Sequence, residues 1–419
     1  MENRKVTLNE LISNMVTEAT RLGFSGSYIW RELTIGCGAV RKYYQANGVI
    51  HFTPDMTLRA LADAENKYRN GDFSRGRVIQ VRGSVRRMNE FYLTGTLQAN
   101  NNRVHSGYIL NGENERLVDE FVSCQGYGEN TVKDAIWVAR KYLYFFEQAG
   151  HSSLATVTVE DVRDFIMDTA AKVRTSTLHD IYLYLHAFHL FLKEHGIQAP
   201  DCADLFSYTI HREMPIQGCV DDDELEKILN IIDRTTESGC RNYAIIVLSS
   251  TTGLRACDII RLKLRDIDWR NGTIHVLQSK TDNTVDIPLL PEAGRAIQDY
   301  ILHYRPKETG CQEVFLRCSA PKTAIMDAVT IGTMFKDYQR RAGVERKAFD
   351  GKGFHGLRRR LAKKLLTSGT AVPVIAQILG HDDVGSARQY MVLDNKNLKE
   401  CAQSFALIPI ERSLLKDEH

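Results

Sequence analysis

Apolar residues recur at helical spacing along most of the chain. The run GCVDDDELEKILNIID, residues 218–233, places apolar side chains at i, i+3 and i+4 behind aspartates that can cap a first turn. Thr53 and Thr158 open two earlier segments of this kind, TPDMTLRALADAE and TVEDVRDFIMDTA, and each threonine can act as a helix cap. The pattern predicts a largely helical protein.

One region of the C-terminal half departs from this spacing. The buried helix expected from RNYAIIVLSSTTG stops at Gly253, and three short segments follow, DIDW, TIHVLQSK and TVDIPL. An Asn-Gly turn at residues 271 and 272 joins the first two. The fold class predicted is therefore mainly α with a small antiparallel β-sheet in the last domain.

Polar and glycine-containing stretches mark two boundaries. The run QANNNRVHSG, residues 98–107, has the composition of a linker, and Gly196 and Pro200 interrupt the helical pattern again. A chain of 419 residues is long enough for two or three domains. We predict helical domains over residues 1–105 and 106–208, and a third domain over residues 209–419.

Composition narrows the class of protein. The net charge is only +2, from 54 Lys+Arg against 52 Asp+Glu, so a nucleic-acid surface would need locally segregated charge. The N-terminus lacks an apolar h-region and no later apolar run reaches about 18 residues, so we expect neither secretion nor membrane insertion but a cytoplasmic protein. The nine cysteines form no CxxC pair and indicate reduced thiols, not zinc ligands or disulfides.

Four places in the C-terminal half combine cations or histidines with the ends of predicted elements. Arg255 follows Gly253 at a helix junction, where a fixed arginine suits a bidentate grip on a phosphate, although pairing with Asp258 would explain it equally well. Lys280 lies at the tip of the predicted hairpin, where a lysine is commonly just solvated. Each of these residues has an ordinary structural explanation when taken alone.

The other two places lie in the segment FHGLRRRLAKKLLTSGTAVPVIAQILGHDDVGSARQY. His355 and Arg358 are spaced i, i+3, which places both on one helix face so that their side chains converge. Residues 336–364 hold eleven Lys+Arg against three Asp+Glu, a density typical of polyanion binding. Gly380 is predicted to close a helix in a left-handed cap that projects His381, and Tyr390 follows in a short helix.

Taken together, six residues resemble in type and order the signature of the tyrosine recombinases, the phage-integrase family. The set is Arg255, Lys280, His355, Arg358, His381 and Tyr390. TTGLRACDII resembles the TGLR motif of the family, QILGH resembles its LGH motif, and the resemblance covers about residues 215–400. One departure follows Arg358, where Arg359, Arg360 and Leu361 precede Ala362 in place of a small or hydroxyl residue and an aromatic.

The resemblance implies metal-free cleavage of a phosphodiester bond, which requires a protein nucleophile, a general acid and cations. Tyr390 would attack the phosphate to give a 3′-phosphotyrosine and a 5′-hydroxyl, while Arg255 and Arg358 would hold the non-bridging oxygens. No carboxylate cluster suited to two magnesium ions accompanies the set, so we expect neither metal nor cofactor.

The remaining residues of the set have supporting roles by the same resemblance. Lys280 would protonate the departing 5′-oxygen, His355 would assist proton transfer at the tyrosine, and His381 would hydrogen-bond the phosphate. Asp258 would hold an arginine or lysine from behind the site.

The resemblance also assigns roles to the three predicted domains. Residues 106–208 would form a core-binding, SAM-like clamp on DNA, residues 209–419 the catalytic domain with a tail helix, and residues 1–105 an accessory DNA-binding or assembly domain. Further cations are candidate contacts to the DNA backbone: Arg359, Arg360, Lys363 and Lys364 in the last domain, and Lys133, Arg140, Lys141, Lys172 and Arg174 in the clamp.

The partners implied are duplex DNA with paired inverted half-sites, three further copies of the chain in a tetramer, and an accessory DNA-bending or directionality factor. The added N-terminal domain favours an integrase or transposon recombinase of a mobile element. Such an enzyme would be associated with the bacterial nucleoid and would exchange DNA strands through a Holliday junction. Two alternatives remain open: a telomere resolvase or type IB topoisomerase-like enzyme of the same fold, and a DNA-binding regulator without catalysis.

Overall fold

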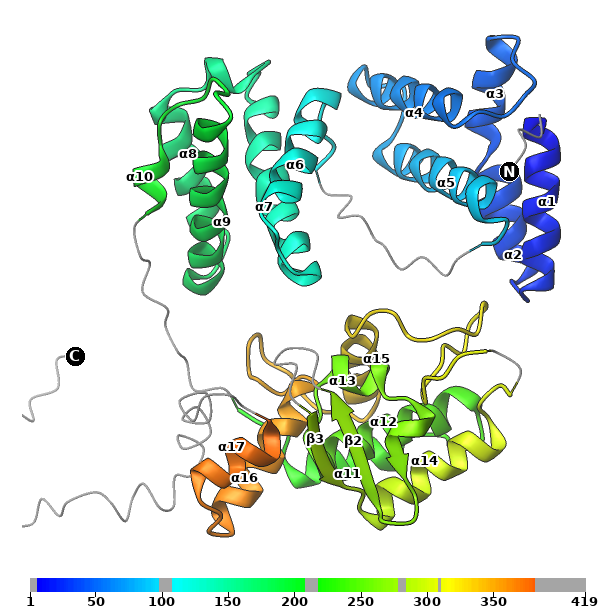
Figure 1. The fold of residues 1–419 in the computed structure, drawn as a ribbon, viewed down its shortest axis with the longest axis vertical. Helices are drawn as coiled ribbons and strands as arrows, with labels where there is room; N and C mark the ends of the chain where they lie inside the picture. Colours follow the sequence, from blue (N-terminus) through cyan, green and yellow to red (C-terminus); the bar gives the residue numbers. More distant parts are fainter. Residues whose placement is uncertain (1–5, 98–107, 208–217, 278–283, 308–309, 381–419) are drawn as a thin grey trace, which may run out of the picture. The chain divides into compact units, whose positions relative to one another are not determined.

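The computed structural model describes residues 6–97, 108–207, 218–277, 284–307 and 310–380 (Figure 1). The fold is mainly helical with one small sheet, which confirms the predicted fold class. The chain forms two compact units, residues 102–215 and residues 1–101 with 216–419. This division does not decide between two and three domains, so the three predicted domains stay a prediction. None of the helices described is both long and apolar enough to cross a bilayer.

Helices joined by turns and loops make up residues 6–97. Their elements are α1 (Leu8–Arg21), α2 (Gly26–Tyr28), the π-helix η1 (Ile29–Ile35), α3 (Gly38–Ala46), α4 (Pro54–Arg69) and α5 (Arg75–Thr94). Helix α4 begins after Thr53, whose hydroxyl accepts a hydrogen bond from the Met56 N–H, so the predicted cap is confirmed. Buried apolar residues such as Met15, Leu33 and Met88 form the core between these helices.

Residues 108–207 form a second helical bundle. Its elements are α6 (Gly112–Cys124), α7 (Glu129–Gln148), the 3-10 helix η2 (Leu154–Thr156), α8 (Val159–Ala170), α9 (Thr175–Glu194) and α10 (Ala203–Phe206). Thr158 caps α8 as predicted, in a capping box with Asp161. In the aromatic core the Tyr142 hydroxyl lies 2.8 Å from Nε2 of His189, and burial lowers the pKa of His189 to about 4.

The C-terminal part, residues 218–380, combines helices with the sheet. Its elements are α11 (Asp222–Asn230), α12 (Glu237–Thr252), α13 (Ala256–Arg261), the 3-10 helix η3 (Leu264–Asp266), β1 (Ile267–Asp268), β2 (Thr273–Leu277), β3 (Thr284–Pro288), α14 (Pro291–His303), α15 (Val329–Arg341), α16 (His355–Thr367) and α17 (Val372–Leu379). Asp221 caps α11 in a capping box with Glu224, as the acidic run predicts.

The sheet has the order β1-β2-β3, with both pairs antiparallel. Ile274 and Val276 of β2 point into the core while His275 between them is exposed, because successive side chains of a strand face opposite sides. Gly272 takes a φ of +61° in the turn between β1 and β2, which a side chain would disfavour. The three strands and the turn predicted from the sequence are confirmed.

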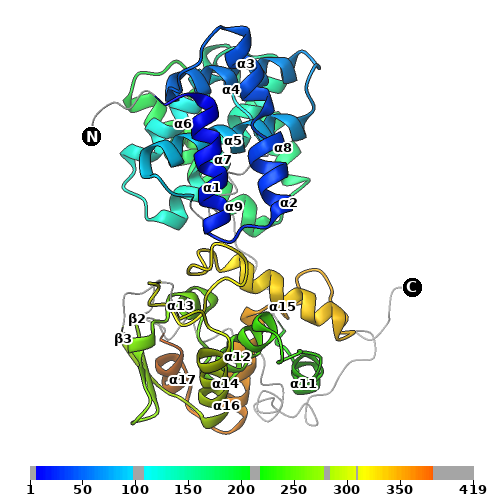
Figure 2. The same cartoon turned by 90° about the vertical axis from the view of Figure 1, so that its right-hand side faces the viewer.

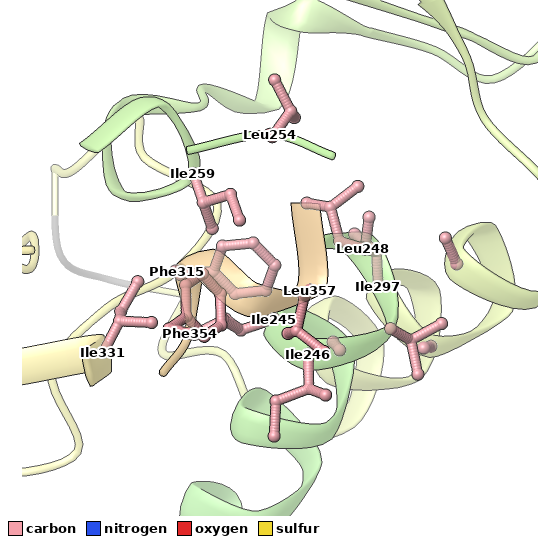
Figure 3. Packing of buried hydrophobic residues seen from close by; sticks show 14 of the residues in the cluster. Ile245, Ile246, Leu248, Leu254, Ile259, Ile297, Phe315, Ile331, Phe354 and Leu357 are labelled. Atoms are coloured by element: carbon pink, nitrogen blue, oxygen red, sulfur yellow. The ribbon is translucent and has the colours of Figure 1, made fainter. Parts of the chain in front are cut away.

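Helix α12 is the central element of the C-terminal part. It packs against α14 on one side and α16 on another, and α16 also contacts α17 (Figure 2). Ile245 and Leu248 of α12, Ile297 of α14 and Leu357 of α16 meet in the main core (Figure 3). This apolar contact fixes α16, the helix that carries His355 and Arg358, onto the helix that ends just before Arg255.

Candidate active site

Arg255 is held by a short junction between two helices. Helix α12 ends at Thr252, Gly253 takes a left-handed φ of +68°, and Arg255 occupies the N-cap position of α13 with extended backbone. Its side chain is 16% exposed, and Nη1 lies 3.9 Å from Oδ2 of the fully buried Asp258. This is a loose ion pair at the limit of contact, so the geometry is compatible with both proposed roles, a phosphate ligand and a partner of Asp258.

Arg358 is buried, with 1% exposure, and its guanidinium joins two helix ends. Nη1 donates to the Gly253 carbonyl at 2.8 Å and Nη2 donates to the Leu379 carbonyl at 2.6 Å. These carbonyls belong to the C-terminal ends of α12 and α17, where helix carbonyls lack partners within the helix and carry partial negative charge. Arg358 therefore links Gly253, at the junction that leads to Arg255, with Leu379, which lies two residues before His381 in the sequence.

Gly253 allows this close approach. A Cβ added at Gly253 would lie 2.8 Å from Cδ2 of Leu379 and 3.1 Å from Cδ2 of Leu361. Leu379 belongs to α17 and Leu361 to α16, so the bare backbone at the end of α12 is the surface on which the other two helices rest. Glycine is needed here for its left-handed backbone and also for its lack of a side chain.

Replacement of Gly253 by alanine is expected to destabilise the C-terminal part more than the same change at Gly343. Both residues follow a helix with a φ of +68°, but a Cβ at Gly343 meets no atom within 4 Å. In both variants the alanine must take a left-handed backbone conformation, which costs about 1–2 kcal/mol of stability. In Gly253→Ala the new methyl group also overlaps neighbouring atoms, and relieving this overlap costs a further 1–3 kcal/mol, roughly the cost of overpacking a core. Urea denaturation measures the difference; equal losses in the two variants would contradict the packing argument.

Three of the six predicted residues lie outside the described residues. Lys280 falls in residues 278–283, between the ends of β2 and β3, and His381 and Tyr390 fall in residues 381–419. The flanking elements agree with the sequence: β2 and β3 pair up to Leu277 and Thr284, and Gly380 closes α17 with a left-handed φ of +63°. The positions of these three side chains stay predictions.

His355 and Arg358 differ in their surroundings although both lie in the first turn of α16. His355 is exposed, whereas Arg358 is buried. The predicted convergence of the two side chains on one point stays a prediction. What helix spacing could not indicate is that Arg358 donates to backbone carbonyls 105 and 21 residues away in the sequence.

The model of the phage integrase family matches residues 219–397, a range that includes all six candidate residues. The integrase/recombinase y4gC of Sinorhizobium fredii is 34% identical over 167 residues, which cover 40% of this chain and 84% of that protein. The chain belongs to the phage integrase family. The resemblance noted from six residues is thereby confirmed at the level of the family.

Other relatives of this integrase-family chain extend the match. The integrase/recombinase y4rA of the same organism is 29% identical over 266 residues, covering 63% of this chain and 64% of y4rA, so the chain spans less than two thirds of that relative. A crystal structure of a lambda integrase tetramer bound to a Holliday junction matches with a TM-score of 0.51 and 16% identity, over 74% of this chain and 86% of that one. At this identity the match shows a shared fold.

The cations that follow Arg358 in this family member divide into two kinds. Arg359 is 6% exposed and donates to the carbonyls of Gly218 and Gly351, which argues against its prediction as a DNA contact. Arg360 forms an ion pair with Asp222 and is only 16% exposed, which also argues against a phosphate contact. Lys363 is half-buried and Lys364 is exposed, and their DNA contacts stay predictions.

The candidate DNA contacts in residues 108–207 divide in the same way. Arg140 pairs with Glu115 and its side chain is 12% exposed. Lys141 donates to the Thr169 hydroxyl and lies over the Phe165 ring, and burial lowers its pKa. Both side chains are committed to the protein, so the structure argues against them as DNA contacts.

The other three clamp cations are exposed: Lys133, Lys172 and Arg174. Lys172 lies 2.5 Å from Asp168 in an i, i+4 pair on the surface, where such pairs contribute little and a phosphate could replace the carboxylate. These three remain candidate contacts.

One histidine–aspartate pair that the sequence did not single out links the two strands β2 and β3. His275 of β2 faces Asp286 of β3, with Nδ1 2.6 Å from Oδ1, and this hydrogen bond raises the pKa of the exposed His275. Strand register is the signal that could have identified it, because directly opposed residues on one face interact. Over the residues that the structure describes, no group of three or more histidine, cysteine, aspartate or glutamate side chains is placed to hold a metal ion.

Proposed function

We propose that this phage integrase family member is a site-specific tyrosine recombinase, which cleaves and rejoins DNA strands during integration or excision of a mobile element. The observation that carries the proposal is the guanidinium of Arg358. It joins the end of α12, which Arg255 follows, to the carbonyl of Leu379 at the end of α17. Three segments that are far apart in the sequence, the ends of α12 and α17 and the first turn of α16, thus meet at Arg358.

The first step that we propose is attack on phosphorus by the Tyr390 hydroxyl oxygen. The new bond joins this oxygen to the 3′-phosphate, and the bond from phosphorus to the 5′-oxygen breaks. Arg255 and Arg358 would hold the non-bridging oxygens, because a guanidinium offers five N–H donors in a rigid plane and stabilises the charge that develops there. Asp258, buried behind Arg255, would keep that guanidinium in place.

Two proton transfers accompany this step. His355, exposed at the start of α16, would accept the proton that Tyr390 loses. Lys280 would donate a proton to the departing 5′-oxygen, and His381 would donate a hydrogen bond to the phosphate. The products are a phosphotyrosine ester and a free 5′-hydroxyl, so neither a metal ion nor ATP enters the balance.

The reverse reaction with a different strand would produce recombination. A 5′-hydroxyl of a partner duplex attacks the phosphotyrosine ester, releases Tyr390 and joins the strands, which passes through a Holliday junction. We propose a tetramer on paired inverted half-sites, supported by the fold shared with the lambda integrase tetramer. Residues 106–208 would clamp the DNA, residues 1–105 would serve assembly or accessory sites, and an accessory factor would bend the DNA or set the direction.

Covalent adduct formation tests this proposal. The full chain is incubated with nicked duplexes that span the DNA flanking its coding region, and adducts are detected as protease-sensitive complexes that survive denaturation. We expect an adduct whose yield is unchanged by excess EDTA, because all groups of the reaction come from protein and DNA. Strict dependence on magnesium would contradict the mechanism and indicate a nuclease.

Two further outcomes separate the alternatives. Sequence-specific binding without any adduct would indicate a DNA-binding regulator. An adduct together with relaxation of a plasmid that holds a single site, but no exchange between two sites, would indicate a topoisomerase-like or telomere-resolving enzyme.

A further inference from the structure

Arg359 is the first of the three residues at which the sequence departs from the family pattern, and it links two backbone segments. It is 6% exposed. Its Nε donates to the Gly218 carbonyl at 2.9 Å and its Nη2 donates to the Gly351 carbonyl. Gly218 is where the described C-terminal part begins, and Gly351 lies just before α16. One side chain on α16 therefore holds the start of this part of the chain to the loop that leads into the helix.

The backbone segments that Arg359 joins are in direct contact. The Val220 N–H donates to the Gly356 carbonyl at 3.4 Å, in the first turn of α16. A Cβ at Gly218 would lie 2.7 Å from the Asp350 carbonyl oxygen, and one at Gly356 would lie 2.8 Å from that of Gly351. We name residues 218–224 the incoming segment. Its first residue, Gly218, lies against the loop without room for a side chain, and the side chain of Val220 packs against Gly356 at the start of α16.

Ion pairs extend this contact along the incoming segment. Lys352 Nζ lies 2.8 Å from Asp221 and 2.7 Å from Glu224, and Arg360 pairs with Asp222. Asp221 and Glu224 also form the capping box of α11, so the same carboxylates begin that helix and bind the loop. The acidic run that the sequence shows as a helix start is thus also the partner of the loop before α16.

Hydrogen bonds hold the loop before α16 together and tie it to α15. Asp350 accepts hydrogen bonds from Nε and Nη2 of Arg346, both at 2.8 Å, and from the backbone N–H groups of Lys347 and Lys352. The Arg346 guanidinium holds the pKa of Asp350 at about 2, so the carboxylate stays charged at any ordinary pH. The buried Gln339 of α15 donates to the Lys352 carbonyl and ties the loop to the core.

We propose that Arg359 is a positioning residue of the cleavage reaction. It fastens the incoming segment and the loop to α16, and thereby sets the placement of His355 and Arg358 in the first turn of that helix. The inference rests on the proposed function, since it concerns the same site. Arg359 touches neither DNA nor the reacting phosphate in this scheme; it acts through the backbone of the helix that carries the reacting groups.

The test uses the full chain with Arg359→Gln, Arg359→Lys and the control Arg360→Gln. Arg360 is the next residue on α16 and also bonds the incoming segment, but at the partly exposed surface. In the absence of DNA we expect Arg359→Gln to speed hydrogen exchange at the amides of Val220, Gly356 and Leu357. Arg360→Gln should leave the exchange of these amides close to that of the parent.

With a half-site duplex, we expect Arg359→Gln to reduce the rate of cleavage much more than the affinity for DNA. Arg359→Gln should bind with a Kd within about threefold of the parent, because no phosphate contact is lost, while the single-turnover rate of adduct formation falls by about 10–100-fold. Arg359→Lys should recover part of the rate, since one ammonium can replace one of the two donated bonds. Arg360→Gln should cleave at close to the parent rate.

Each contrary result overturns the proposal. A normal cleavage rate in Arg359→Gln with faster exchange would make Arg359 a purely structural residue. Weaker binding with a salt dependence reduced by about one counterion would make it a phosphate contact instead. If the parent chain forms no adduct, the proposed function fails, and the exchange experiment still decides whether Arg359 holds the incoming segment to α16.

Discussion

Replacement of Tyr390 by phenylalanine is expected to abolish covalent attachment of the protein to DNA. The change removes only the hydroxyl oxygen that would form the bond to phosphorus, so the ring and the charge of the chain are unchanged. Without a nucleophile the other groups have no reaction to assist, and adduct formation should fall by at least about 10⁴-fold. Binding to a half-site should stay near that of the parent, because a neutral hydroxyl adds little to the phosphate contacts.

Tyr304→Phe is the matched control for this experiment. Tyr304 follows α14 and packs against the main core, and its loss of a hydroxyl should leave the adduct yield intact. The measurement is gel detection of protein–DNA adducts after denaturation. An adduct that persists in Tyr390→Phe would show that another side chain is the nucleophile.

Replacement of Arg358 by lysine is expected to impair both folding and cleavage. A lysine keeps the positive charge, but its single nitrogen cannot occupy both Nη positions that donate to Gly253 and Leu379. At least one helix-end carbonyl loses a charged donor in a buried place, which should lower the free energy of unfolding of the C-terminal part by about 2–4 kcal/mol. Adduct formation should slow by about 10²–10³-fold, since a guanidinium that we propose to hold the phosphate is also lost.

Arg255→Lys is the control that separates the effect on folding from the effect on cleavage. Arg255 lies at a partly exposed junction, and its contact with Asp258 is a loose 3.9 Å ion pair that a lysine can replace. We expect a comparable loss of cleavage but a smaller loss of stability than in Arg358→Lys, because the lysine ammonium keeps a positive charge beside the buried Asp258. Urea denaturation followed by Trp269 fluorescence reports on the C-terminal part once Trp30 and Trp137 are replaced by phenylalanine. Equal stability losses in both variants would contradict the structural role of Arg358.

The two neighbouring arginines of α16 illustrate different uses of one residue type. Arg358 and Arg359 are both buried, and both donate to backbone carbonyls. Arg358 joins the helix ends that flank the site, whereas Arg359 joins the start of the C-terminal part to the loop before the helix. A count of positive charge in this stretch suggested affinity for DNA, but two of these charges serve to hold the backbone together.

Local signals in the sequence were sufficient to predict where several helices begin and where the sheet forms. The caps at Thr53, Thr158 and Asp221 and the left-handed closures at Gly253 and Gly380 depend on residues within a few positions of each other. The alternation of β2 and β3 is equally local. These features could be predicted because the groups that satisfy one another are adjacent in the chain.

By itself, the sequence determined the fold class, the family and the order of the six candidate residues, because residue type and spacing carry that information. Only the tertiary structure decided which cations face the protein. Their partners lie far away in the sequence, so no repeating pattern of residues could have indicated them. This applies to Arg359, Arg360, Arg140 and Lys141. The same holds for Arg358, whose two acceptors become available only when α12, α16 and α17 pack together, since a buried donor takes whichever acceptor the packing brings within reach.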